Sequence, residues 1–236
     1  MAKRTIKYIT RQLLRRSGFD IVRFRGKFED LQAFLLDQNQ VTLLIDVGAN
    51  QGQYSQRMRQ LGYNGKIVAF EPLPGAHAAL TQNFQGDAHF EARACAVSDV
   101  NGSLTIHVSR NSVSSSTLPM STLHAEADSQ SSYIGETTVA AVRLDSLDLG
   151  TGPFWLKIDV QGAEMAALEG ASGILEHIRV LQLEMSLVSL YEGSALAEEV
   201  MSWARAKGFR PAFIEGGFQD PRDGRMLQVD GLFTRE

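Results

Sequence analysis

The chain has 236 residues, of which 44% are hydrophobic and 21% are charged, a composition that is ordinary for a soluble globular protein with a buried core. A single cysteine, Cys95, excludes an intrachain disulfide, and the lack of a signal core or of roughly 18 consecutive apolar residues predicts a cytoplasmic protein. The net charge of −4 combines +8 over residues 1–27 with −12 over the remainder, which indicates an anionic partner for the first segment only.

The first 39 residues are expected to form an N-terminal helical extension ahead of one domain, residues 40–236. The stretch "KRTIKYITRQLLRR" (3–16) predicts a basic helix with four basic residues on one face: Lys3, Lys7, Arg11 and Arg15. Such a face would suit peripheral contact with an anionic membrane surface. The alternative is that this helix packs on the domain or on a second subunit and its charges are solvated. A second helix is expected over "FEDLQAFLL" (28–36).

From residue 40 onward, short apolar strands alternate with amphipathic helices. The expected strands are 43–47, 66–70, 88–97, 154–159 and 179–185. The expected helices are 53–61, 74–84, 163–176 and 195–207. This alternation indicates an α/β fold with a parallel sheet that is covered on both faces.

The middle of the chain departs from this alternation. The stretches "GSLTIHVS" (102–109) and "TTVAAVRL" (137–144) predict a β-hairpin around a long loop, residues 109–136, that is rich in Ser and Thr. Loops of this length inside compact domains are usually functional lids or mobile surface segments, and both interpretations stay open here.

The C-terminal stretch also differs from the rest. Residues 210–216 and 225–233 read as strands on either side of "GFQDPRDG", which leaves no room for a crossover helix. A strand pair without a crossover must be antiparallel, so we expect the last strand to close the sheet in the antiparallel sense.

The first strand and its turn, "LLIDVGANQGQY", point to a ligand site, because ligands of open parallel sheets bind at the carboxyl ends of the strands. Gly48 and Gly52 would let the backbone approach a ligand. The turn lacks the middle glycine of a pyrophosphate-binding loop, and Asp46 would repel a pyrophosphate but suit the cationic groups of S-adenosylmethionine (SAM). Glu71, at the end of the second strand, could accept hydrogen bonds from the ribose hydroxyls of SAM or of a nicotinamide dinucleotide. SAM is therefore favoured, and a nicotinamide-dependent oxidoreductase is the weaker alternative.

Several blocks carry a resemblance to a known family: "IDVGANQGQYS", "FEPLP", "ACAVSD", "LDSLDL", "LKIDVQGAEMAALEGA" and "LQVDGLF", in this order. From about residue 40 to its end, the chain resembles the FkbM-type family of SAM-dependent methyltransferases. The resemblance implies a class I methyltransferase (Rossmann-like) fold with seven strands, the last antiparallel. It also implies O-methylation of a hydroxyl-bearing small molecule or glycan.

The resemblance further implies the residues that hold SAM. Those expected at its methionine end are Asp46, Gly48, Asn50 and Gly52, with Tyr54 and Ser55 beside them. Glu71 would bind the ribose, and Pro72 would fix the chain that leaves it. The main chain of Ala96 and the side chain of Asp99 are candidates near adenine, although Asp99 reads equally well as a loop acid before a turn.

Three further residues are candidates for the chemistry. A hydroxyl is a poor nucleophile at neutral pH, so a base or a metal ion would assist methyl transfer. Asp159 ends the strand 154–159, Lys157 precedes it on the same face, and Glu184 lies near the end of the next strand, so the two acids could converge. Lys157 would orient Asp159 or simply pair with it, and Glu184 has the alternative role of bridging its loop. A Mg²⁺ ion on Asp159 and Glu184 is an alternative that the spacing does not require, so no metal ligand is predicted.

A methyltransferase that acts on nucleic acid through the basic N-terminus is kept as an alternative, although nucleic acid is not the expected substrate. Amino-methylating enzymes of nucleic acids usually carry an Asn/Asp-Pro-Pro-aromatic stretch after the fourth strand, where this chain has "DVQG", and the domain is acidic. A lipid hydroxyl stays open as the acceptor, and no residue pattern indicates an oligomeric state. The intact site motifs argue against a scaffold without catalytic activity.

Overall fold

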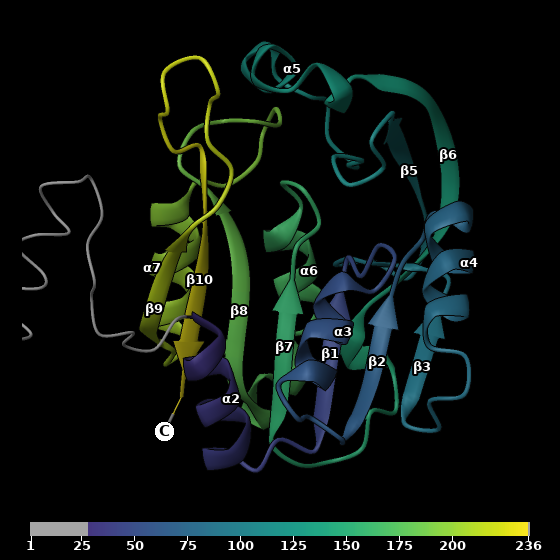
Figure 1. The fold of residues 1–236 in the computed structure, drawn as a ribbon, viewed down its shortest axis with the longest axis vertical. Coiled ribbons are helices and arrows are strands. Elements are labelled where there is room, and N and C mark those ends of the chain that lie inside the picture. The colour runs from purple at the N-terminus through teal and green to yellow at the C-terminus, as the bar shows by residue number, and fades with distance from the viewer. Residues whose placement is uncertain (1–27, 236) are drawn as a thin grey trace, which may run out of the picture.

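The computed structural model describes residues 28–235, which form a twisted seven-stranded sheet with a smaller sheet beside it (Figure 1). In spatial order the strands of the large sheet are β3 (Phe90–Arg93), β2 (Lys66–Phe70), β1 (Leu43–Val47), β7 (Phe154–Ile158), β8 (Ile178–Ser186), β10 (Gln228–Thr234) and β9 (Arg210–Gly216). The pairs from β3 to β8 are parallel, whereas β10 runs antiparallel to both β8 and β9. The predicted class I fold with an antiparallel last strand is thus confirmed.

Helices cover both faces of this sheet (Figure 1). They are α2 (Phe28–Gln38), α3 (Gln53–Gln60), α4 (Pro74–Asn83), α6 (Glu164–Gly170) and α7 (Ala197–Ala206). Strand β1 is buried along its whole length: Leu43 and Ile45 pack in the core beneath α6 and α7, while Leu44 packs in the core beneath α2 and α3. Two covered faces explain why the central strands read as continuous apolar runs in the sequence.

Two predicted elements are wrong in extent. The expected strand 88–97 is two strands, β3 and β4 (Ala96–Val97), because the chain leaves the large sheet after Arg93 and pairs in the smaller one. The expected helix 163–176 is α6 followed by the 3₁₀ helix η3 (Ser172–His177). Asp145 accepts a hydrogen bond from the main-chain N–H of Gly173, and this side chain replaces the helical acceptor at the break. The other predicted elements occur with ends that differ by a few residues.

The predicted hairpin is confirmed, and the loop between its strands has structure of its own. Strands β5 (Gly102–Ser109) and β6 (Tyr133–Val142) pair antiparallel in a three-stranded sheet with β4. Between them lie α5 (Thr122–Ala127) and the 3₁₀ helix η1 (Ser129–Ser131). Figure 1 shows α5 above the carboxyl ends of the central strands. Ala127 packs against Leu190, Tyr191 and Leu227, so the far end of the insertion is anchored to the C-terminal half of the domain.

The predicted basic helix 3–16 lies outside the described residues, whereas α2 packs directly on the domain. Phe28, Leu35 and Leu36 share a core with residues of β1 and β7, and Gln32 donates a hydrogen bond to Gln182 of β8. The expected boundary between residues 39 and 40 therefore falls within one continuous core. Among residues 28–235, no helix has the length and apolar character needed to cross a membrane.

Candidate active site

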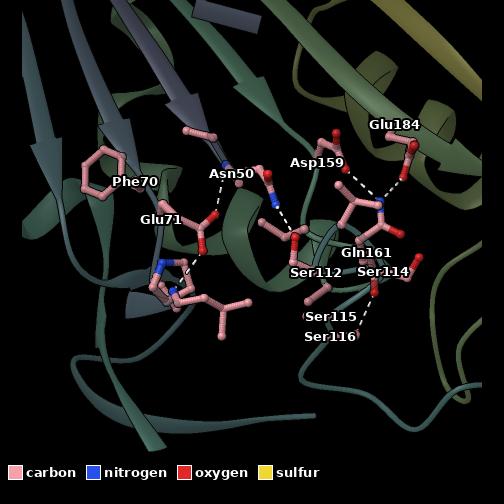
Figure 2. A pocket seen from close by; sticks show the side chains of 18 of the residues that line it. Asn50, Phe70, Glu71, Ser112, Ser114, Ser115, Ser116, Asp159, Gln161 and Glu184 are labelled. Carbon is pink, nitrogen blue, oxygen red and sulfur yellow. Dashed lines mark hydrogen bonds between the residues drawn. The ribbon is translucent and has the colours of Figure 1, made fainter. Parts of the chain in front are cut away.

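A cavity of about 520 Å³ lies at the carboxyl ends of β1, β2, β7 and β8. This volume is within the range of roughly 300–1,000 Å³ that is usual for small-molecule sites. Residues 111–117 of the Ser-rich insertion form one wall, which we call the roof. Figure 2 shows the roof serines facing the acidic side chains that project from the strand ends.

The two glycines of the first turn are required by protein packing. Gly48 has a φ of +75°, and a Cβ there would overlap the main-chain oxygen of Asp159. Gly52 has a φ of +91°, and a Cβ there would collide with Leu80 and Phe84. Gly48 lines the cavity, whereas Gly52 does not. The two glycines are therefore needed because a larger residue would collide with the chain just after β7 or with α4 and the residue that follows it. The sequence pattern did not reveal this reason.

A buried network supports the turn from below. Asp46 is fully buried, and its Oδ2 accepts a hydrogen bond of 2.7 Å from Ser55. The Nζ of Lys157 lies 3.3 Å from the Oδ1 of Asp46 and 3.5 Å from the Oδ2 of Asp159, and it also donates to the carbonyl oxygen of Gly48. Burial alone would lower the pKa of Lys157, but Asp159 and Asp46 outweigh it and hold this pKa above its ordinary value. Asp46 and Ser55 thus act on the cavity through Lys157 and the turn.

Glu71 offers a place for two neighbouring hydroxyl groups. Its Oε2 accepts a hydrogen bond of 2.9 Å from the main-chain N–H of Asn50, and its Oε1 accepts one of 2.8 Å from Leu73 (Figure 2). Each oxygen retains a lone pair for a ligand. Burial raises the pKa of Glu71, although the two N–H groups oppose this shift. Pro72 follows on the cavity wall. This arrangement fits the ribose of SAM.

The other residues expected to bind SAM are only partly brought together. Tyr54 lines the cavity, its hydroxyl donates to Gln182 at 2.9 Å, and its ring centroid lies 5.5 Å from the Nζ of Lys157. Ala96 also lines the cavity. Asp99 does not, and its carboxylate accepts a hydrogen bond from Ser98, so its position gives no support to a contact with adenine.

The two acids expected to converge do so through a residue that the sequence interpretation missed. The Nε2 of Gln161 donates to the Oδ1 of Asp159 at 2.8 Å and to the Oε2 of Glu184 at 2.7 Å (Figure 2). A second amide, the Nε2 of Gln228, donates to the same Glu184 oxygen at 2.8 Å. Gln161 stands inside the motif "DVQGAE", so its place beside Asp159 was a signal that could have been used. Gln228 reaches the site only through the antiparallel pairing of β10 with β8.

Burial and mutual repulsion raise the pKa values of three carboxyl groups at this site, those of Glu184, Glu164 and Asp230. Burial, with the charges of Asp159 and Glu164, raises the pKa of Glu184 well above its ordinary value. Burial also raises the pKa of Glu164 to about 7 and that of Asp230 to about 6. Burial therefore favours the protonated form of each of these three acids relative to an exposed carboxyl group. Within the described part of the chain, no three His, Cys, Asp or Glu side chains gather in a way that could hold a metal ion.

The sheet with its single reversed strand, the glycine turn after β1 and the acid after β2 define a class I methyltransferase. Residues 46–211, more than half of the chain, match the family described as the methyltransferase FkbM domain, and the chain belongs to this family. Residues 46–211 therefore form a methyltransferase domain of the kind that uses SAM as its methyl donor. The alternative of a nicotinamide-dependent oxidoreductase is wrong.

Individual proteins show the same likeness. The 2-O-methyltransferase NoeI of Sinorhizobium fredii (strain NBRC 101917 / NGR234) is 29% identical over 166 residues, which cover 64% of this chain and 66% of NoeI, just under two thirds of its length. The methyltransferase sdnD of Sordaria araneosa is 27% identical over 192 residues, which cover 70% of this chain and 73% of sdnD. The solved structure of magnesium protoporphyrin IX methyltransferase (ChlM) from Synechocystis PCC 6803, with bound SAM, aligns with 98% of this chain and 97% of its own at 13% identity, with a TM-score of 0.48.

Proposed function

We propose that the protein transfers the methyl group of SAM to a hydroxyl of a sugar, a glycan or a glycosylated natural product. The observation that carries the proposal is the placement of Asp159 and Glu184 at adjacent strand ends, in the same cavity as Glu71 and the first turn. Transfer to oxygen needs a proton acceptor beside the nucleophile, and Asp159 supplies one. The name of NoeI, a 2-O-methyltransferase, supports oxygen as the receiving atom.

The residues that line the cavity support an assignment of the side that would bind SAM. The methionine end would lie against Gly48, Asn50 and Tyr54, with Asp46 and Ser55 supporting the turn from within. Glu71 would take the two ribose hydroxyls on its free lone pairs. Adenine would lie near Ala96. Asp99 is left out of this assignment because it does not line the cavity.

The residues of the chain supply a base and a means of alignment. When bound, SAM supplies a methyl group on a positively charged sulfur. Transfer of this methyl group to the acceptor oxygen would break the carbon–sulfur bond and leave its electron pair on sulfur. Asp159 receives the hydroxyl proton, and Lys157, with its Nζ 3.5 Å from the Oδ2, orients this acid. Glu184 lies on the adjacent strand and faces the same space, where burial and the charge of Asp159 raise its pKa well above the ordinary value; its Oε1 would help to orient the acceptor.

The roof fits an acceptor that is rich in oxygen atoms. The hydroxyl oxygens of Ser112, Ser114 and Ser115 each accept a hydrogen bond within the protein, from the side chains of Asn50 and Asn111 and the main chain of Ser109 respectively. Among the hydrogen bonds of residues 28–235, none uses the O–H of these three serines as donor. Three O–H donors on one wall, opposite two carboxyl groups, match the hydroxyl and ring oxygens of a sugar.

A labelling experiment tests the acceptor class. Methyl-labelled SAM is added to a cell extract together with the wild-type protein or, as a matched control, the Asp159→Asn variant. Mass spectrometry after fractionation should find the label in the methyl ether of a sugar with the wild-type protein only. Label confined to nucleic acid, to protein or to a lipid without sugar would overturn the proposal.

A further inference from the structure

Gln161 contacts both candidate catalytic acids and the roof at once (Figure 2). It has a φ of +57°, in the left-handed region that residues other than glycine seldom occupy. Its side chain bonds to Asp159, Glu184 and Tyr191, and its main-chain oxygen accepts a hydrogen bond of 2.6 Å from Ser116. The strained backbone is thus held by contacts on every side of the residue, as is typical of a functional position.

The orientation of the Gln161 amide is fixed by its partners. The Oδ1 of Asp159 and the Oε2 of Glu184 act as hydrogen-bond acceptors, the latter also from Gln228, so the NH₂ group of Gln161 faces these two oxygens. The Oε1 then faces Tyr191, whose hydroxyl donates to it at 2.8 Å. Turning the amide over would place its oxygen against two carboxylates. The side chain therefore has one favourable orientation, and it divides its two N–H groups between the two acids.

Each acid uses one carboxyl oxygen to accept a hydrogen bond from Gln161, so its other oxygen remains for a ligand in the cavity. Gln161 occupies the Oδ1 of Asp159 and the Oε2 of Glu184. The Oδ2 of Asp159 remains, oriented by Lys157, and so does the Oε1 of Glu184. A carboxylate whose second oxygen is fixed loses less entropy when it meets an acceptor hydroxyl, so rigid placement of both acids favours the reaction geometry.

The roof is aligned by the same residue. Ser116 donates to the main-chain oxygen of Gln161, and Tyr191, which bonds the Gln161 side chain, also approaches the main-chain oxygen of Ser114 at 3.2 Å. A Cβ at Gly162 would lie 3.0 Å from Tyr191, so the chain beside Gln161 packs closely on this ring. Roof and acids therefore share one point of attachment.

We propose that Gln161 is a positioning residue that orients Asp159 and Glu184 and fixes the position of the roof relative to these two acids. Its role in turnover rests on the function proposed above. The charged and titratable groups that face this site are Lys157 of β7, Glu164 of α6, Asp230 of β10 and Tyr191 of the loop after β8. None of the four can replace the Gln161 amide, which alone among the described residues donates to both acids.

Carboxyl ¹³C NMR tests the proposal without any acceptor. In protein labelled at Asp and Glu, Gln161→Leu removes a donor from both carboxylates, so the apparent pKa values of Asp159 and Glu184 should both rise by about one unit. The matched control Gln228→Leu removes a donor from Glu184 alone, and its effect on Asp159 should be clearly smaller, carried only by coupling between the two acids. Unchanged titration of both acids in folded Gln161→Leu would overturn the proposal.

A measurement on the wild-type protein covers the case in which Gln161→Leu fails to fold. The two side-chain amide protons of Gln161 should shift with pH, one following Asp159 and the other following Glu184. Amide protons that do not respond to either titration would overturn the proposal equally.

Turnover then separates this proposal from the proposed function. With the acceptor found by labelling, Gln161→Leu should lower kcat by about 10- to 100-fold while the Kd for SAM from calorimetry changes by less than about threefold. Normal kcat with shifted titrations would remove the role in turnover and leave the proposed function intact. Shifted titrations without any sugar acceptor would remove the proposed function and leave the orientation of the two acids by Gln161 intact.

Discussion

Lys157 and Asp46 form an ion pair in the centre of the sheet, with 3.3 Å between Nζ and Oδ1. The Lys157 side chain is 8% exposed and that of Asp46 is 0% exposed, so water screens neither charge. A buried pair of this kind contributes little net stability, but the loss of one partner leaves an uncompensated charge in a low-dielectric environment. The pair therefore couples the first turn to the candidate base, because the same Lys157 also faces Asp159.

Lys157→Met should lower the free energy of unfolding by about 3–5 kcal/mol, because it leaves Asp46 charged and unpaired inside the sheet. The pKa of Lys157 is higher in the folded protein than the ordinary lysine value. The stability that the ion pair contributes is therefore fully present below the ordinary lysine pKa and is lost only as pH rises through the folded value. The test can accordingly be made at pH 7. Urea denaturation measures the change. The double variant Asp46→Asn/Lys157→Met should regain a clear part of the loss, and no regain would contradict the ion-pair account.

Glu71→Ala should weaken SAM binding by about 1–3 kcal/mol, since it removes charge-assisted hydrogen bonds to two hydroxyl groups. Isothermal calorimetry measures the affinity, and circular dichroism checks the fold. Burial raises the pKa of Glu71. When the solution is acidified, the affinity of the wild-type protein for SAM should therefore begin to fall at a higher pH than it would if this carboxylate were exposed. An unchanged affinity in the folded variant would refute the ribose assignment.

Asp159→Asn should reduce turnover by about 10²- to 10⁴-fold while SAM still binds, because the variant keeps the shape of the side chain but cannot accept the hydroxyl proton. The measurement is release of S-adenosylhomocysteine with the acceptor identified by labelling. Asp99→Asn is the matched control, since Asp99 does not line the cavity and its replacement should leave turnover near normal. Near-normal turnover in Asp159→Asn would remove this acid from the mechanism.

Glu164→Gln should change how stability depends on pH. The pKa of Glu164 is about 7 in the folded protein and about 4.3 when unfolded. Between these values the folded state holds the extra proton, so wild-type stability falls as pH rises, by up to about 3 kcal/mol. Glutamine can still accept the hydrogen bonds from Val160 and Gly162. The variant should therefore lose less stability than the wild type between pH 5 and pH 8, and parallel denaturation profiles would contradict the assignment.

The basic segment 3–16 lies outside the described residues, and its contact with a membrane surface stays a prediction. Six Lys and Arg residues at about 1 kcal/mol each near an anionic surface could hold the protein there at moderate salt. Co-sedimentation should show binding to anionic but not to neutral vesicles. The binding should disappear at high salt and on deletion of residues 1–17. Protein that stays in the supernatant with anionic vesicles at low salt would rule out this contact.

Much of the fold could be predicted because the governing signals are local. The apolar run before Asp46 and the stretch at the C-terminus that is too short for a crossover helix are both visible in the sequence, and they define the parallel sheet with its reversed last strand. The switch between sheets after Arg93 could not be predicted, because it depends on pairing with β6, about 45 residues away. Hydrophobic periodicity indicates which residues of a strand are buried, but it does not identify the strand with which it pairs.

The candidate site shows the same division. Asp159 and Glu184 could be expected to converge because parallel strands end at one edge of a sheet. The amides that bind them could not, since Gln228 arrives by an antiparallel strand and Gln161 depends on a left-handed backbone that no pattern indicates. The packing role of Gly52 could not be predicted for a similar reason. It depends on contacts with Leu80 of α4 and with Phe84, which follows that helix.

The contact between α2 and the sheet has a practical consequence for anyone who shortens the chain. Gln32 donates to the amide oxygen of Gln182, which also receives the hydroxyl of Tyr54, and Phe28 lines the cavity. A fragment that starts at residue 40 would uncover Leu44 and Trp155 on one side of the sheet and leave Gln182 with one donor fewer. Truncations meant to preserve ligand binding should therefore start before Phe28.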